Sequence, residues 1–227
     1  MPLPRELAAR IRSSAYPKTN AFPPILLRGK RVLDLGCGYN ALAVDGASVF
    51  GVDAFSAPRP ELRDRIKFVR GNMERLPFSD ASLDFISSRN ALYYSHMPTT
   101  LHEVRRVLRP GGTLWGTLAT WPEAATRLVA SLVVLNVRDM ALVSYVFLNG
   151  LLATVSGKQV RWIGRNRCES VNTCLSIRRL LRDAGFENVC AEHFDRKIIF
   201  SAVKPAKDGP PGPRGENYET AGLSGRR

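Results

Sequence analysis

The sequence has few of the side chains that hold metal ions or disulfide frameworks. Its 227 residues include four cysteines and three histidines, and no two cysteines form a Cys-X-X-Cys pair. This pattern argues against a metal site and against a disulfide-stabilised fold, and it favours reduced thiols in the cytoplasm. The N-terminus lacks the apolar run of a secretory signal, but it contains arginine and little acid, so organelle targeting stays open.

No apolar run is long enough to cross a membrane, which takes about 20 residues in a helix. The two most apolar stretches, Leu128–Leu135 and Met140–Leu152, are separated or interrupted by Asn136, Arg138, Asp139 and Asn149. We therefore expect no transmembrane segment. Two helices that cover part of a domain fit better, and we predict a helical cap at about 120–170.

Acidic residues are also scarce, with 20 Asp and Glu against 33 Lys and Arg, a formal net charge of +13. Such a surface attracts anionic partners, among them nucleic acid, anionic lipid and acidic metabolites. The charge does not choose among these partners, and a basic, solvated surface without a partner explains it equally well.

What is present is the alternation of a parallel sheet with crossover segments. The predicted strands are Arg31–Leu35, Ser48–Asp53, Ile66–Val69, Leu83–Ser88, Gly112–Leu118, Glu187–Phe194 and Lys197–Val203. Apolar periodicity predicts helices over Thr99–Leu108 and Asn172–Ala184. We expect an N-terminal helix or lid segment over 1–29, one domain over 30–203, and a disordered tail over 204–227, where Pro and Gly are frequent and no apolar period exists.

A glycine-containing turn follows the first predicted strand, in Val32-Leu33-Asp34-Leu35-Gly36-Cys37-Gly38. The two glycines remove side chains that would keep a ligand from the backbone, and the following amides can then face an anionic or polar group at the start of a helix. Asp53 ends the next strand, where a carboxylate can accept hydrogen bonds from both hydroxyls of a ribose. Together, the glycine turn and Asp53 favour a site for an adenosine-containing ligand. The alternatives are an ordinary strand-to-helix turn at the two glycines and a surface cap at Asp53.

The segment Asp34-Leu35-Gly36-Cys37-Gly38 resembles motif I of the class I S-adenosylmethionine-dependent methyltransferases, in particular the small-molecule, quinone or sterol type. Three further segments are similar in the family's order: 71–78, 82–86 and 103–112. The resemblance implies an α/β, Rossmann-like seven-stranded sheet whose last strand is antiparallel, here with the helical cap inserted after strand five. It implies S-adenosylmethionine as the cofactor.

The resemblance also implies a role for each matching residue. Gly36 and Gly38 would let the methionine part approach the backbone, Asp34 would order the loop and reach the amino group, and Asp53 would hold the ribose. The other cofactor-binding residues would be Asn72 and Met73 at the adenine and Asn90 near the sulfonium.

The sequence departs from the family between motif I and the second strand. Only twelve residues separate Asn40 from Asp53, about one helical turn fewer than usual. Ala41–Val44 would leave little more than a stub of the first helix, with a weak dipole at the cofactor.

The acceptor side is less defined. Tyr93 and His96 follow the fourth strand, where this fold presents substrate-facing groups, and His96 is a candidate general base. The competing interpretation makes them packing and loop residues. We expect methyl transfer to a small hydrophobic or amphipathic acceptor. The alternatives are an RNA or protein methyltransferase, suggested by Arg161, Arg165 and Arg167, and a non-catalytic binding protein. The oligomeric state is not predicted.

Overall fold

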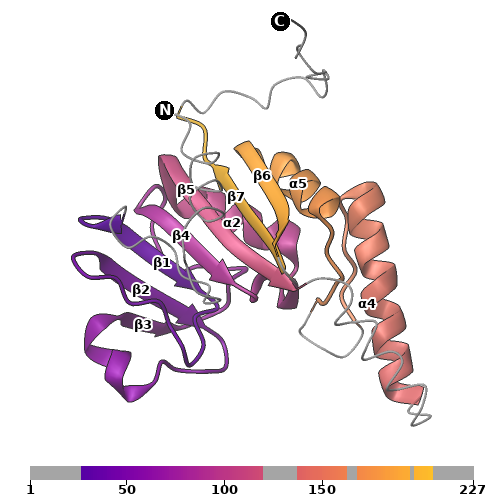
Figure 1. Cartoon of the computed structure of the whole chain (residues 1–227), viewed down its shortest axis with the longest axis horizontal. Coiled ribbons are helices and arrows are strands. Elements are labelled where there is room, and N and C mark those ends of the chain that lie inside the picture. The colour runs from indigo at the N-terminus through magenta and orange to yellow at the C-terminus, as the bar shows by residue number, and fades with distance from the viewer. Residues whose placement is uncertain (1–26, 120–136, 163–167, 195–196, 207–227) are drawn as a thin grey trace, which may run out of the picture.

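A seven-stranded sheet forms the centre of the computed structural model, which describes residues 27–119, 137–162, 168–194 and 197–206 (Figure 1). The strand order is β3-β2-β1-β4-β5-β7-β6. Strands β1 to β5 pair in parallel, whereas β7 is antiparallel to both β5 and β6. This confirms the predicted Rossmann-like sheet with an antiparallel last strand. The strands are β1 (Arg31–Leu35), β2 (Ser48–Asp53), β3 (Lys67–Arg70), β4 (Leu83–Arg89), β5 (Leu108–Ala119), β6 (Glu187–Phe194) and β7 (Lys197–Val203).

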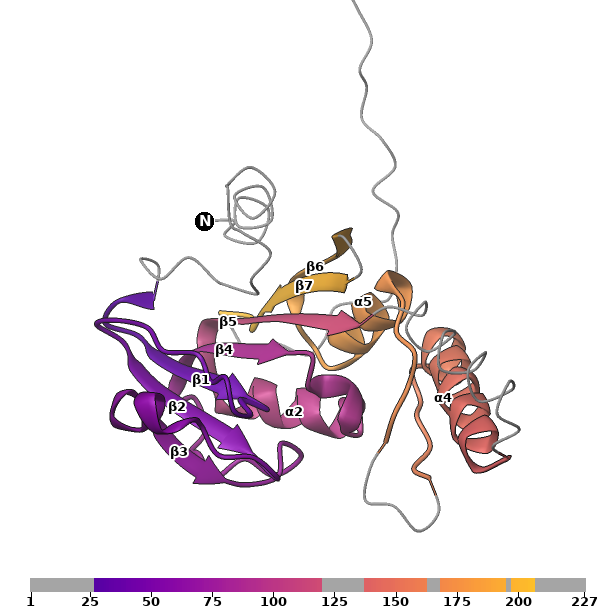
Figure 2. The ribbon, with the colours of Figure 1, turned by 60° about the horizontal axis from the view of Figure 1, so that its bottom comes forward.

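Two helices cover one face of the sheet. Helix α2 (Met97–Val107) and helix α5 (Cys174–Asp183) share a core cluster with buried residues of β1, β4, β5 and β7 (Figure 2). At the start of α5, Thr173 and Ser176 form a reciprocal capping box, which satisfies two backbone N–H groups. The shorter elements are the 3-10 helices η2 (Pro60–Arg65) and η3 (Leu92–Tyr94).

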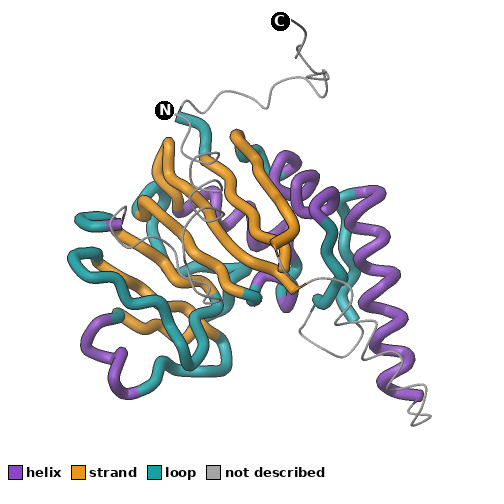
Figure 3. The backbone as a smooth tube through the Cα atoms, in the orientation of Figure 1, coloured by secondary structure: helices purple, strands orange, loops and turns teal. Residues whose placement is uncertain are grey.

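The other face carries a smaller core cluster, covered in part by the loop between β1 and β2. Residues 36–47 are all described and contain no helix (Figure 3). The predicted stub at Ala41–Val44 is therefore wrong. Only seven residues, 41–47, precede β2 after Asn40, which leaves too little chain to offset the cost of helix nucleation. Ala41 and Val44 instead bury their side chains against Val32 and Val49 of the sheet.

Strand β5 begins four residues earlier than predicted because the Pro110-Gly111-Gly112 turn pairs with the end of β7. The backbone N–H of Lys204 donates to the Gly112 carbonyl, and the Lys204 carbonyl accepts the Gly111 N–H. Its side chain is buried, and Nζ donates to the Leu108 carbonyl at 2.9 Å. Ordered chain thus continues past Val203. The predicted tail from 207 onward and the predicted lid over 1–26 lie outside the described residues.

Helix α4 (Val137–Ser156) extends the helix predicted over Met140–Leu152, and the apolar stretch at 128–135 lies outside the described residues. On its inner side Gly150 lies against the backbone of Val171, where a Cβ would stand 2.3 Å from the Val171 carbonyl oxygen. Figure 2 shows α4 beyond the carboxyl ends of β4 and β5. In the part of the chain that the structure describes, none of the helices is both long and apolar enough to span a bilayer.

Candidate functional site

Three loops meet at the carboxyl edge of the sheet and bring together residues that are far apart in the sequence. Gly36 follows β1, Met73 follows β3 and Ala91 follows β4. A Cβ on Gly36 would lie 2.2 Å from the Ala91 Cβ and 3.4 Å from the Met73 Cε, and Gly36 has φ +69°. Both the close approach and the left-handed backbone require glycine at this position.

Asp53 organises the edge between β1 and β2. Its Oδ2 accepts the Gly38 N–H at 3.0 Å, and its Oδ1 accepts those of Phe55 and Ser56 at 2.8 Å each. The carboxylate is partly exposed and lies beside the predicted glycine turn. The structure therefore places Asp53 and Gly38 together, as the predicted ribose site requires.

The amides of the glycine turn itself are engaged within the chain. Gly36 and Cys37 both donate to the Val52 carbonyl, at 2.8 and 3.2 Å, and Gly38 donates to Asp53. Because residues 36–47 contain no helix, the predicted helix start is absent, and a ligand contact of the amides after Gly38 stays a prediction. Cys37 is buried there, and burial, with the nearby charges of Asp34 and Asp53, raises the pKa of its thiol to about 12. Its role is packing.

An ion pair that the sequence did not reveal closes the loop from the other side. The buried Asp34 accepts at Oδ2 from the Leu42 N–H and from Nη2 of Arg89, both at 2.7 Å. The same Nη2 donates to the Asn40 carbonyl at 2.7 Å. Burial raises the pKa of Asp34, although the Arg89 guanidinium opposes this shift. The sequence offered one signal for this ion pair: Arg89 ends β4, and the three residues before it are uncharged.

Each member of this pair keeps one buried polar atom unused. Asp34 Oδ1 and Arg89 Nε have no hydrogen-bond partner among the described residues. Buried polar groups in folded proteins are nearly always paired, so an unpaired acceptor and an unpaired donor side by side need an explanation. One of these atoms is an acceptor and the other a donor, on two residues that form an ion pair.

The predicted adenine and sulfonium residues lie at the same edge with local roles of their own. The exposed Asn72 accepts the Glu74 N–H at Oδ1, at 2.9 Å. Asn90 has φ +54°, and its N–H donates to the Thr117 carbonyl of β5 at 2.8 Å. These contacts fix both loops, and the cofactor roles of Asn72, Met73 and Asn90 stay predictions.

His96 is the N-cap of α2, which neither interpretation of the sequence anticipated. Its Nδ1 accepts the Thr99 N–H at 3.4 Å and lies 2.8 Å from the Thr99 hydroxyl. In the neutral tautomer that accepts at Nδ1, Nε2 carries the proton and cannot serve as a base. The neighbouring Tyr93 hydroxyl donates to that of Tyr94 at 2.8 Å.

If His96 is a cap, asparagine should replace it. We expect His96→Asn to keep the melting temperature and turnover, since Asn is a preferred N-cap. His96→Ala should cost about 1 kcal/mol of unfolding free energy. Thermal unfolding and methyl transfer, measured on both variants, check this. If both variants fold but have lost turnover, His96 is a base.

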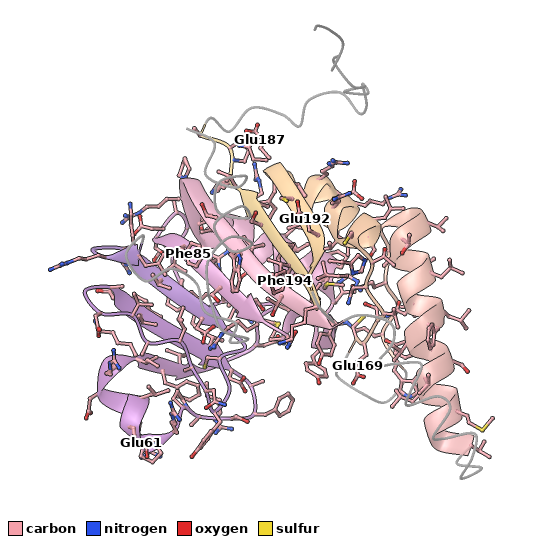
Figure 4. All side chains as sticks on the ribbon, viewed as in Figure 1. Glu61, Phe85, Glu169, Glu187, Glu192 and Phe194 are labelled. Carbon is pink, nitrogen blue, oxygen red and sulfur yellow. The ribbon has the colours of Figure 1, made fainter. Side chains whose placement is uncertain are left out.

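The segment after α4 lies against this acceptor side. Glu74 accepts the His96 N–H at Oε1 (2.8 Å) and pairs through Oε2 with Arg161, and the Cys168 N–H donates to the Tyr94 carbonyl. Figure 4 shows Glu169 between the end of β5 and α4. Arg161, a candidate RNA contact, is thus engaged with Glu74, and Arg165 and Arg167 lie outside the described residues.

An apolar groove of about 300 Å³ runs between α4 and this segment. Its wall includes Tyr145, Leu148 and Leu152 of α4 together with Val160 and Trp162. The Tyr145 hydroxyl donates to the Val160 carbonyl at 2.7 Å and ties the two walls together. The groove has the size and apolar character of small ligand sites.

Known proteins share this arrangement over part of their length. The profile of a methyltransferase domain family matches residues 33–116. A phthiotriol/phenolphthiotriol dimycocerosates methyltransferase of Mycobacterium leprae is 40% identical over 100 residues, which make up 39% of this chain and 37% of that protein. A sterol 24-C-methyltransferase of Gibberella zeae is 33% identical over 99 residues, 37% of this chain and 26% of that protein.

A solved structure extends the likeness of the fold. An S-adenosylmethionine-dependent methyltransferase of Methanosarcina mazei matches with a TM-score of 0.53 and 18% identity, over 83% of this chain and all of that one. The chain aligns with 37% of the length of the first of these curated relatives and with 26% of the second. On these grounds residues 33–116 are similar to the methyltransferase domain family, and the described sheet has the fold of the class I S-adenosylmethionine-dependent methyltransferases.

Proposed function

We propose that this protein transfers a methyl group from S-adenosylmethionine to a small hydrophobic or amphipathic acceptor. One observation carries the proposal: the carboxyl edge of the sheet brings Asp34, Gly36, Gly38 and Asp53 together beside the unused buried atoms Asp34 Oδ1 and Arg89 Nε. Residues of this kind fit a nucleoside joined to an amino acid.

The chain's own groups would divide the cofactor among them. The Asp53 carboxylate accepts hydrogen bonds from the ribose hydroxyls, and Asn72 and the Met73 N–H hold the adenine. Asp34 Oδ1 accepts from the ammonium and Arg89 Nε donates to the carboxylate of the methionine part. Bound S-adenosylmethionine supplies a methyl group on a sulfonium, which is already a good leaving-group centre.

The protein's task is then mainly to align the acceptor. Proximity and orientation can supply on the order of 7–11 kcal/mol of barrier reduction in favourable cases. An acceptor atom that loses no proton before attack needs no general base, which agrees with the capping role of His96. Tyr93 and Tyr94, whose ring centroids lie 4.1 Å apart at an interplanar angle of 41°, would line the approach to the methyl group.

Two features support an apolar acceptor. The groove on α4 is walled mostly by apolar side chains, and the segment that forms its second wall contacts the Glu74–His96 side of the site. The names of the two relatives specify a dimycocerosate and a sterol acceptor. The RNA alternative gains nothing from Arg161, because Glu74 occupies it.

Cofactor binding tests the proposal at Asp53. S-adenosylhomocysteine should bind one-to-one in calorimetry, and Asp53→Ala should weaken binding by roughly 1–3 kcal/mol, the scale for a lost hydrogen bond to a charged group. Asp45→Ala is the matched control, since the exposed Asp45 carboxylate pairs with Arg65 and not with the glycine turn. A folded wild type that binds no S-adenosylhomocysteine would favour the non-catalytic interpretation. Labelled methyl transfer to lipid, metabolite and RNA extracts then identifies the acceptor.

A further inference from the structure

The outer side of α4 is an exposed apolar stripe. Among the α4 side chains that the structure describes, the exposed ones follow one line along the helix at alternating spacings of four and three residues: Val137, Ala141, Ser144, Leu148, Leu151 and Val155. Leu148, Leu151 and Val155 are 66%, 61% and 66% exposed. No residue from Met140 to Gly157 is charged. A surface helix normally turns a charged or polar face to water, whereas the exposed side chains that the structure describes on α4 are apolar except for Ser144.

The stripe continues into the groove on the same helix. Leu148 belongs to both, and the groove lies along α4 beside the edge-to-face ring pair of Tyr145 and Trp162. An apolar ridge beside an open apolar groove accommodates flexible hydrocarbon chains, which can lie along the ridge and enter the groove.

Cations stand next to this apolar surface. Arg179 of α5 donates to the Val155 carbonyl at 2.5 Å, which places its guanidinium at the C-terminal end of the stripe. The exposed residues of α5 are Leu175, Arg179, Arg182 and Asp183, of which Asp183 pairs with Arg179 at 3.7 Å, and the exposed Lys158 follows α4. An apolar helix bordered by cations is the arrangement of proteins that lie on anionic membrane surfaces.

Charge also decides between a bilayer and a second copy of the chain. Each copy carries a formal net charge of +13, so two copies repel one another, whereas an anionic surface attracts both. The positions that flank the stripe, Tyr145, Phe147, Leu152 and Thr154, offer no charges that could pair across a helical dimer.

We propose that the outer face of α4 docks on the surface of an anionic lipid bilayer. Leu148, Leu151 and Val155 enter the acyl region, while Arg182 and Lys158 meet the phosphates. The helix lies in the interface and does not cross it. This inference stands apart from the proposed methyl transfer, because docking needs neither the cofactor nor the acceptor.

Vesicle cosedimentation of the full chain tests the docking surface. We expect binding to vesicles of phosphatidylcholine mixed with phosphatidylglycerol, and much weaker binding to phosphatidylcholine alone or at high salt. Leu148→Gln/Leu151→Gln should weaken binding by roughly tenfold or more, because the variant loses the favourable transfer of two leucine side chains from water into the bilayer. Arg182→Gln should weaken binding to the anionic vesicles and reduce its salt dependence. Val69→Gln, at an exposed apolar position of β3, is the matched control and should bind like wild type.

Cofactor affinity separates docking from folding. All these variants should have the melting temperature of wild type. If wild type binds S-adenosylhomocysteine, the variants should bind it with the same affinity. The proposal is overturned if wild type binds neither vesicle, including the case in which it binds RNA instead. It is also overturned if the leucine pair variant binds vesicles as wild type does. A wild-type dimer in light scattering that the pair variant converts to monomer would assign the stripe to a second copy. A large loss of melting temperature in the pair variant would show that another part of the chain covers the stripe.

Discussion

Gly36→Ala should lower the free energy of unfolding by about 3 kcal/mol and abolish binding of S-adenosylhomocysteine. Two costs add: φ +69° strains an L-residue, and the new Cβ would stand 2.2 Å from that of Ala91. Relief of the overlap must separate the loops after β1 and β4, which together form the edge where the cofactor is held. Chemical unfolding and calorimetry measure the two effects.

Two further variants separate strain from overlap. Gly36→Ala/Ala91→Gly removes the methyl group that the new Cβ would strike, so it should recover more than half of the lost stability. Gly38→Ala has a similar backbone, with φ +55°, but its Cβ would meet nothing nearer than Asp53 Oδ2 at 3.9 Å. It should cost about 1–2 kcal/mol, the strain alone. Equal losses at Gly36 and Gly38, with no rescue by Ala91→Gly, would contradict the overlap.

Asp34→Ala should be comparably damaging, with a loss of about 3–5 kcal/mol, because it leaves the Arg89 guanidinium without its partner. Asp34→Ala/Arg89→Met removes both charges and should recover much of that stability. It should still fail to bind S-adenosylhomocysteine, since both unused polar atoms are gone. The matched control is the more exposed pair of Asp84 with Arg109, where Asp84→Ala should cost no more than about 1 kcal/mol. A double variant that binds the ligand normally would refute the amino acid site.

The same carboxylate predicts a pH dependence. Burial raises the pKa of Asp34 above its ordinary value of 3.8. On acidification the native chain therefore takes up this proton before the unfolded chain does. The negative charge that would hold an ammonium is lost at a pH above the range of an ordinary aspartate. Affinity for S-adenosylhomocysteine should fall over that range in wild type, and Asp34→Asn should be weaker and flat there. An identical pH profile in both proteins would exclude the role of Asp34.

Most of the sheet could be predicted because its strands are short apolar runs bounded by glycine, proline or charged residues. The predicted bounds of β1, β2, β6 and β7 agree with the structure residue for residue. The order of the motifs gave the family, and hence the antiparallel β7, which apolar periodicity alone does not specify. The start of β5 was placed too late because a proline and two glycines normally mark the end of a ladder, whereas here Lys204 pairs with them.

The site was only partly predictable. The spacing of Asp34, Gly36 and Asp53 in the sequence predicted them as site residues, and the structure brings them to one edge, while their roles toward the cofactor stay predictions. Arg89 was missed because an arginine at a strand end is usually solvated, and only the fold shows that it reaches Asp34. The direction of the Gly36 and Cys37 amides, and the capping role of His96, depend on tertiary hydrogen bonds that no local pattern encodes.

The position of β7 has a consequence for how the chain is made. β7 is the last strand in sequence, yet it lies between β5 and β6 and pairs with both. Until residues 197–203 leave the ribosome, β5 has no partner on one side, although β1 to β4 are already synthesised. Unpaired edges invite association with other chains. The nascent protein therefore passes through a stage in which the edge of β5 is open to such association, and pairing with β7, which also holds β6, ends that stage.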